Sequence, residues 1–360
     1  MSSTDNRSPS IVASSASMPK RPPRAVRWLL TALLTLMIGA CGATPPSKQD
    51  LILATWNIEH LAARDGTGCR PRGGADYAEL RRHAAALGAD IIALQEVEDR
   101  AAVARVFDPS VYDIVVSARP EGDLGECRAQ PGQRRTPQRT GFAIHRARLA
   151  EMGLQWYSMP ALTDLGIAGR RWGTQIRIAP ADGRGPAVRL VSLHLKSGCG
   201  WGRLDRTNVR REQCRLLRRQ RGILEAWIDE QATAEQPFIL LGDFNRQLDQ
   251  PRDDFWRDID DGMVCDWTPD RRLGRRCRPG SDRPNPNADL WLANAGVPFP
   301  YAYNPDYPYA IDHLVFDGRS AGWIRRGSYD VYDYGGAEPT PSDHYPIRMA
   351  IRLPAVATLR

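Results

Sequence analysis

Residues 238–245 read FILLGDFN, an apolar run that ends in a glycine and the polar residues Asp243 and Asn245. A short apolar run of this kind predicts a buried β-strand. Polar side chains at the end of such a strand commonly build a functional site, because the rigid sheet holds them in place. This stretch therefore predicts a sheet-based fold with a site at one edge of a sheet.

The same arrangement recurs along the chain. Other apolar runs that we predict to be strands cover residues 51–57, 90–97, 112–117, 141–145, 173–178, 188–195, 311–316 and 346–353. Polar residues at or near the ends of several of these runs are Asn57, Glu96, His194, Asp312, Asp343 and His344. We therefore expect these side chains to meet Asp243 and Asn245 at one rim of the fold.

Helical stretches alternate with the predicted strands. We predict helices over 77–87 and 203–230, long surface loops over 121–138 and 262–308, and a hairpin-like pair from 173–178 and 188–195. Because no break in composition divides residues 50–355, this range is interpreted as one domain of α/β or α+β class, built as a sandwich. The content of 42% hydrophobic residues excludes wholesale disorder, and the presence of only one long apolar run excludes a multi-span membrane protein.

The candidate site residues share one chemistry. Carboxylates and amide oxygens are the ligands that Mg²⁺ prefers, since it favours octahedral oxygen coordination. Zinc would require more cysteine and histidine. Two histidines, His194 and His344, titrate near neutral pH, and with a hard cation they can activate water and protonate a leaving oxygen. The pattern indicates hydrolysis of a phosphate ester.

Six segments resemble one known superfamily. They are ATWNIEH, ALQEVED, LVSLHLKSG, LLGDFN, IDHLVF and SDHYPI, in that order over residues 54–347. The chain resembles the endonuclease/exonuclease/phosphatase superfamily, which includes deoxyribonuclease I, neutral sphingomyelinases and inositol polyphosphate 5-phosphatases. The resemblance implies a four-layer α/β/β/α sandwich, like that of deoxyribonuclease I, with the site at one edge.

The resemblance also implies a metal site. Asn57 and Glu96 match the metal-binding pair on the first two core strands, and Asp343 matches the carboxylate near the metal. The implied cofactor is Mg²⁺, with Mn²⁺ as an alternative.

Catalytic roles follow in the same way. Asp243 and Asn245 resemble the pair that meets the scissile phosphate and the metal, and His194 resembles the histidine of the deoxyribonuclease and sphingomyelinase branches. His344 resembles the general acid/base, with Asp312 as its orienting carboxylate. Two departures stand out. The stretch 136–140 lacks the carboxylate that orients the histidine of deoxyribonuclease I, so the partner of His194 is open. LVSLHLKSG also differs from the abasic-site endonuclease branch.

The N-terminus predicts export. A basic patch precedes an uncharged run over 28–40, which is too short to span a bilayer comfortably and fits a secretory signal. Because small residues precede Cys41, residues 1–40 are interpreted as a signal peptide with a lipobox, and 41–49 as a flexible tether. We expect an exported lipoprotein of the bacterial cell envelope, held at the membrane by lipid on Cys41. Plain secretion, with Cys41 incidental, is the alternative.

Six cysteines remain after Cys41. An even number in an exported chain favours disulfides, although six cysteines allow 15 pairings. Pairing neighbours in sequence predicts Cys69–Cys127, Cys199–Cys214 and Cys265–Cys277. The alternative, buried reduced thiols in a cytosolic protein, conflicts with the signal.

Charge bears on the substrate. Of the net charge of +7, most lies in residues 1–40, where five basic residues face one acidic residue. Arginines crowd residues 134–139, 203–221 and 271–283, and on the rim of the site they would form a track for a polyanion. We expect a monomeric, Mg²⁺-dependent nuclease that cleaves phosphodiesters outside the cytoplasm. The alternatives are a sphingomyelinase-like or small-molecule phosphoesterase, or an inactive binding module.

Overall fold

The computed structural model describes residues 47, 49–121, 124–204, 211–301, 308–337 and 339–354. The predicted signal peptide, Cys41 and most of the predicted tether lie outside the described residues. Within them, no helix is both long and apolar enough to cross a membrane.

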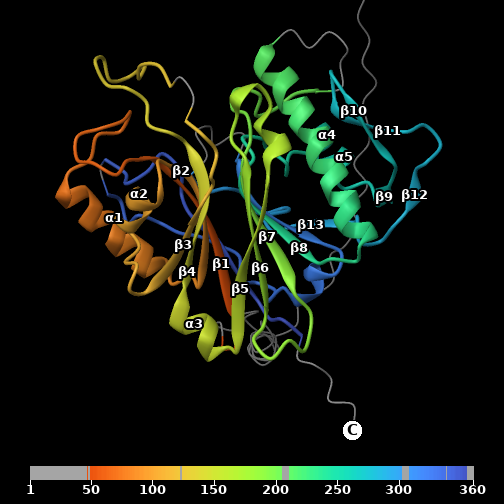
Figure 1. Ribbon diagram of the computed structural model, residues 1–360, viewed down its shortest axis with the longest axis horizontal. Helices are drawn as coiled ribbons and strands as arrows, with labels where there is room; N and C mark the ends of the chain where they lie inside the picture. Colours follow the sequence, from red (N-terminus) through yellow and green to blue (C-terminus); the bar gives the residue numbers. More distant parts are fainter. Residues whose placement is uncertain are drawn as a thin grey trace, which may run out of the picture. The chain divides into compact units, whose positions relative to one another are not determined.

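Two six-stranded sheets form the centre of the domain (Figure 1). The first sheet has the order β15-β16-β1-β2-β4-β3. Its strands are β1 (Leu51–Leu61), β2 (Ile91–Val97), β3 (Tyr112–Val116), β4 (Arg139–His145), β15 (Asp330–Val331) and β16 (Ile347–Ile351). The strands β1 and β2 are parallel neighbours, so their carboxyl ends, which carry Asn57 and Glu96, reach the same edge.

The second sheet has the order β13-β14-β8-β7-β6-β5. Its strands are β5 (Leu154–Leu162), β6 (Gly173–Pro180), β7 (Val188–His194), β8 (Phe238–Asp243), β13 (Leu290–Leu292) and β14 (Asp312–Asp317). The expected antiparallel pairing of 173–178 with 188–195 is confirmed. The parallel register of β7 on β8 pairs His194 with Asp243, and the antiparallel register of β14 on β8 pairs Asp312 with Asp243. Three predicted site residues thus stand side by side on adjacent strands.

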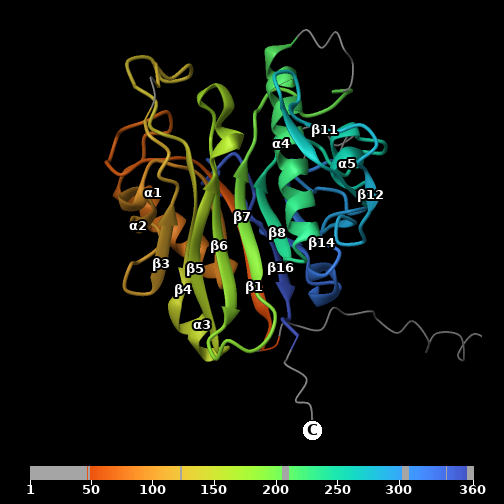
Figure 2. The same ribbon diagram turned by 45° about the vertical axis from the view of Figure 1, so that its right-hand side comes forward.

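Helices cover the outer faces of both sheets, so the four-layer sandwich is confirmed (Figures 1 and 2). On the first sheet lie α1 (Gly74–Leu87) and α2 (Arg100–Ala104), and on the second lie α4 (Glu212–Thr233) and α5 (Asp254–Ile259). In α4, Leu217, Leu224 and Ile228 recur at helical spacing and are buried against the second sheet. The short helices α3 (Arg146–Glu151), η2 (Thr163–Gly169) and η3 (Ser320–Trp323) lie in connections.

The inner faces of the sheets pack an apolar core between them. Polar bridges cross this core near the site. The amide of Gln95 on β2 accepts a hydrogen bond from Thr55 at 3.1 Å and donates to the hydroxyl of Ser192 on β7 at 3.1 Å. A buried amide without partners would be costly, so these bonds favour one relative placement of the sheets.

The structure differs from the sequence-based expectations in several elements. The long helix starts at Glu212, not at 203, because Leu204 is held in a loop, where its backbone N–H donates to Asp254 Oδ2 at 2.6 Å. The predicted loop over 262–308 contains β13 and also β9 (Met263–Val264), β10 (Trp267–Asp270), β11 (Gly274–Cys277) and β12 (Arg283–Pro284). The strand β5 had not been predicted. All three predicted disulfides are present.

Candidate active site at the strand ends

Asp243 lies at the centre of the site, where the two sheets meet. Its Oδ2 atom is 3.3 Å from His194 Nε2 on the neighbouring strand β7. The same oxygen accepts a hydrogen bond from Asn57 Nδ2 of β1, at 3.1 Å. Asp243 therefore joins residues from both sheets, and all three side chains are buried.

The residues around Asp243 explain the GDFN segment. Gly242 adopts φ +150°, and a Cβ atom there would lie 2.1 Å from the carbonyl oxygen of Leu193, so only glycine fits. Asn245 has φ 52°, a left-handed conformation that asparagine tolerates better than most residues. Its backbone N–H and side-chain amide donate to the Asp243 carboxylate at 2.7 and 2.9 Å. The turn thus holds the Asn245 amide beside the carboxylate.

His344 and Asp312 form a hydrogen-bonded pair. His344 Nδ1 is 2.6 Å from Asp312 Oδ2, and His344 Nε2 points back to Asn57 Nδ2 at 3.4 Å and Asp243 Oδ2 at 3.9 Å. Burial alone would lower the pKa of His344, but the charge and hydrogen bond of Asp312 outweigh it and raise that pKa well above its usual value. His344 therefore carries a proton at neutral pH in the metal-free protein.

Glu96 lies beside His194, on the neighbouring sheet. Its Oε1 atom is 3.7 Å from His194 Nε2, and its Oε2 atom accepts the backbone N–H of His60 at 3.1 Å. Glu96 adopts φ 60°, a left-handed conformation that turns its side chain at the end of β2.

Asp343 is more exposed than the other predicted site residues. Its side chain is 62% exposed on the rim, 3.9 Å from His344 Nε2.

The buried charges at the centre would accommodate a cation. Ligand atoms of Asp243, Asp312 and His344 lie within 4.8 Å of one another. Burial raises the pKa of Asp243 to about 7, against the effect of the positive charge on His344. Among the described residues, Asp312 Oδ1 is buried without a hydrogen-bond partner. Buried carboxylate oxygens with unused acceptor capacity fit a hard divalent cation, with Asn57 and Glu96 next to them.

Arg171 is a site residue that the sequence analysis missed. It precedes β6 and belongs to no recognisable motif, so only the fold reveals it. Its guanidinium donates to the carbonyl oxygens of His194 and Leu195 at 3.2 and 2.5 Å. Burial lowers the pKa of Arg171 to about 10, although Glu96 and Asp243 oppose the shift. Burial and the charge of Arg171 also lower the pKa of His194 well below its usual value, so His194 is neutral.

Further cations gather on the Arg171 side of the site. Burial lowers the pKa of Lys196, and so do the charges of Arg170, Arg171 and Arg128. The same charge of Arg170 reaches Arg119, whose pKa is also lowered, mainly by burial. We call Arg119, Arg128, Arg170, Arg171 and Lys196 the basic rim.

The arginines of residues 203–221 and 271–283, which the sequence suggested as a track, do not belong to the basic rim. Several of them are neutralised within the second half of the domain, and Arg221 is buried. Their ion pairs are Arg221–Asp258 at 2.6 Å, Arg275–Asp164 at 2.8 Å, Arg283–Asp266 at 3.6 Å and Arg278–Asp266 at 3.7 Å. The expected track along 203–221 and 271–283 is therefore less suited to a polyanion than the basic rim.

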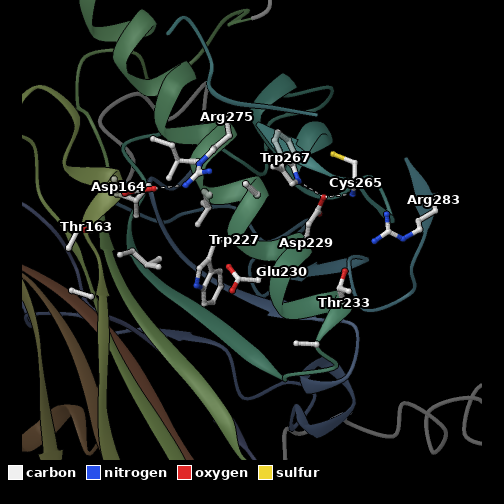
Figure 3. A pocket seen from close by; sticks show the side chains of 17 residues that line it. Thr163, Asp164, Trp227, Asp229, Glu230, Thr233, Cys265, Trp267, Arg275 and Arg283 are labelled. Carbon is white, nitrogen blue, oxygen red and sulfur yellow. Dashed lines mark hydrogen bonds and ion pairs between the residues drawn. The ribbon is translucent and has the colours of Figure 1, made fainter. Parts of the chain in front are cut away.

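A cavity of about 650 Å³ lies apart from these residues, between α4, η2 and the β10–β11 hairpin (Figure 3). Two pairs of its polar side chains bind each other. Trp267 Nε1 donates to Asp229 Oδ2 at 2.7 Å, and Arg275 contacts Asp164. None of the predicted site residues lines this cavity, so it is not the candidate active site.

Comparisons with known proteins identify one family. The profile of the Endonuclease/Exonuclease/phosphatase family matches residues 54–344. No curated protein sequence matches significantly. Similar solved structures include the human Nocturnin catalytic domain with bound sulfate anion, at 15% identity over 85% of this chain and 95% of that chain, with TM-score 0.49. Another is ANGEL2, a 2',3'-cyclic phosphatase, at 15% identity over 84% of this chain and 96% of that chain, with TM-score 0.48. A third is D. rerio TDP2 complexed with single strand DNA product, at 10% identity over 84% of this chain and 98% of that chain, with TM-score 0.47.

Proposed function

Because the chain belongs to the endonuclease/exonuclease/phosphatase family of metal-dependent phosphoesterases, we propose that it is a nuclease that hydrolyses phosphodiester bonds with Mg²⁺ as its cation. The observation that carries the nuclease proposal is the position of Arg171, which binds the carbonyl oxygens of His194 and Leu195 beside the buried acidic centre. Arg170 and Lys196 of the basic rim are direct chain neighbours of these residues. A polynucleotide presents further phosphates on both sides of the scissile bond, and such phosphates bind clustered arginine and lysine.

The geometry supports hydrolysis in which water attacks phosphorus, gives its proton to the Asp243 carboxylate and displaces the ester oxygen. A bound divalent cation would neutralise the carboxylates and polarise the phosphate. Asp243 and Asn245 stand at the strand end where the phosphate would bind, with neutral His194 beside them. His344, held by Asp312 through Nδ1, has Nε2 facing the centre of the site, where it would donate a proton to the ester oxygen that leaves as the P–O bond breaks.

A panel of substrates tests the nuclease proposal. We expect the purified protein with Mg²⁺ to cleave DNA or RNA, and the Michaelis constant for the polymer to rise steeply with salt because counterions compete for the basic rim. A small phosphodiester should show little salt dependence. Turnover of sphingomyelin vesicles or phosphate monoesters, with none of either nucleic acid, would contradict the proposal. It would favour the phospholipid or small-ester alternative.

We also propose that the protein acts outside the cytoplasm as a lipoprotein anchored through Cys41. The three disulfides support this proposal, because disulfides persist mainly in oxidising compartments. Cys41→Ser is expected to abolish fatty-acid labelling and membrane retention in a bacterial host, as measured by metabolic labelling and fractionation. A wild-type protein that takes up no fatty acid and leaves the cell freely would overturn the anchor.

A further inference from the structure

Trp201 is conspicuous for its exposure. Its side chain is 68% exposed, whereas the other exposed large apolar residues of the described chain reach 44% at most. It lies between two glycines, Gly200 and Gly202, in the connection from β7 to α4. Figure 2 shows β7 and the start of α4 reaching the same upper end of the domain. An indole in water gains nothing for folding, so its exposure needs another explanation.

The segment that carries Trp201 is braced on both sides. The disulfide Cys199–Cys214 joins it to the first turn of α4. The guanidinium of Arg246 donates to the carbonyl oxygens of Cys199 at 3.1 Å and Gly202 at 2.5 Å. The backbone N–H of Gln247 donates to the Gly200 carbonyl at 2.9 Å. The main chain is therefore held immediately before and after the exposed indole.

The brace depends on Arg246, whose charged side chain is costly to bury. It is 1% exposed, and a buried guanidinium is tolerated only when its charge is compensated. Asp253 and Asp254 provide that compensation at 2.6 and 2.9 Å. Asp254 Oδ2 also accepts the backbone N–H of Leu204, so one buried ion cluster fixes the loop. Such a fixed mount preorganises an exposed side chain for binding.

The brace also places Trp201 next to the active site. Arg246 directly follows Asn245 in the chain, and a Cβ atom on Gly200 would lie 3.7 Å from the Asn245 carbonyl oxygen. The same segment begins at Lys196 of the basic rim. The main chain that carries the indole therefore lies beside Asn245, and it continues from Lys196 of the basic rim.

We propose that Trp201 is a substrate-binding residue that stacks on a nucleobase of a polynucleotide whose phosphates lie on the basic rim. This inference rests on the proposed nuclease function and names the part of the site that contacts a base. Aromatic stacking suits every base, because each has a flat π-face. Insertion into a membrane would require a contiguous apolar patch, and the exposed large apolar residues of the described chain are scattered over separate elements.

Kinetics of Trp201 variants test the proposal. Trp201→Ala is expected to raise the Michaelis constant for a single-stranded oligonucleotide about 5- to 100-fold, and to leave both constants for bis(p-nitrophenyl) phosphate unchanged, since that ester offers no base. Trp201→Phe should recover most of the loss. Trp291 on β13, which is 37% exposed, provides the matched control. Trp291→Ala should leave the Michaelis constants for both substrates unchanged. An unchanged Michaelis constant in folded Trp201→Ala would overturn the proposal.

A binding measurement separates this inference from the nuclease proposal. In the His344→Ala background with Mg²⁺, an intact oligonucleotide should quench tryptophan fluorescence, and Trp201→Phe should remove that quenching. If the wild type cleaves no polynucleotide, the nuclease proposal fails, while the quenching still tests Trp201 directly. Quenching that persists in Trp201→Phe would refute the stacking role. So would a Trp201-dependent blue shift with sphingomyelin vesicles and no response to the oligonucleotide.

Discussion

His344→Ala is expected to lower kcat for phosphodiester hydrolysis by about 100- to 10,000-fold, the usual effect of removing a general acid. The imidazole is held by Asp312 at 2.6 Å, with Nε2 facing the centre of the site. Alanine removes the proton donor while the surrounding main chain keeps its support, because Ser342 Oγ still donates to the carbonyl oxygen of Asn57. The measurement is kcat for bis(p-nitrophenyl) phosphate and for an oligonucleotide, with thermal unfolding as the check on folding.

Two further variants sharpen this test. Asp312→Asn should lower the pKa of His344, because the charge that raises it is lost, and should reduce kcat in the same direction as His344→Ala. His145→Ala is the control, since that imidazole accepts the N–H of Arg148 at the start of α3, away from the site. Undiminished kcat in a folded His344→Ala variant would exclude His344 as the general acid.

Removal of divalent cations is expected to abolish turnover. The centre of the site holds Asp243 and Asp312, with Glu96 beside them, and this concentration of carboxylates would repel a phosphate without a cation. The raised pKa of Asp243, about 7, reflects the cost of ionising it when buried. EDTA should therefore eliminate activity, and added Mg²⁺ or Mn²⁺ should restore it, whereas Zn²⁺ alone should not.

Glu96→Gln tests the same prediction through binding. The variant removes one negative charge beside the centre, so it should raise the Mg²⁺ concentration needed for half-maximal activity and weaken Mg²⁺ binding in calorimetry. Glu79→Gln on α1, where the carboxylate contacts Arg82, is the control and should alter neither quantity. Turnover that survives exhaustive chelation would rule out the metal-dependent mechanism for this chain.

The residue pattern by itself predicted a sandwich of α/β or α+β class and the polar residues at the strand ends, while the family resemblance implied its four layers. Short apolar runs bounded by polar residues have few compatible structures, so β1, β2, β7, β8 and β14 could be predicted. The disulfides Cys69–Cys127, Cys199–Cys214 and Cys265–Cys277 also matched pairing between neighbours in sequence. The strands depend on local pattern, which a single sequence contains, whereas Cys69–Cys127 joins residues 58 positions apart and needed the fold to bring them together.

Strand register was decided only in the tertiary structure. The pairing of His194 and Asp312 with Asp243 depends on how β7 and β14 align on β8, and a shift by one residue would turn each side chain to the opposite face. Tertiary packing also leaves Asp343 exposed on the rim and brings Arg171, which no motif marks, against the carbonyl oxygen of His194.

Charged residues show the same contrast between what the sequence indicates and what the fold decides. Clusters of arginine were visible in the sequence, but Coulomb interactions depend on distance in space, and the fold paired Arg221 and Arg275 with acids far along the chain. The fold also placed the buried Arg246, the residue after Asn245, against the carbonyl oxygens of Cys199 and Gly202 on either side of Trp201. Local patterning therefore determined the elements and their chemistry, whereas long-range packing decided which charges meet and which side chains face the substrate.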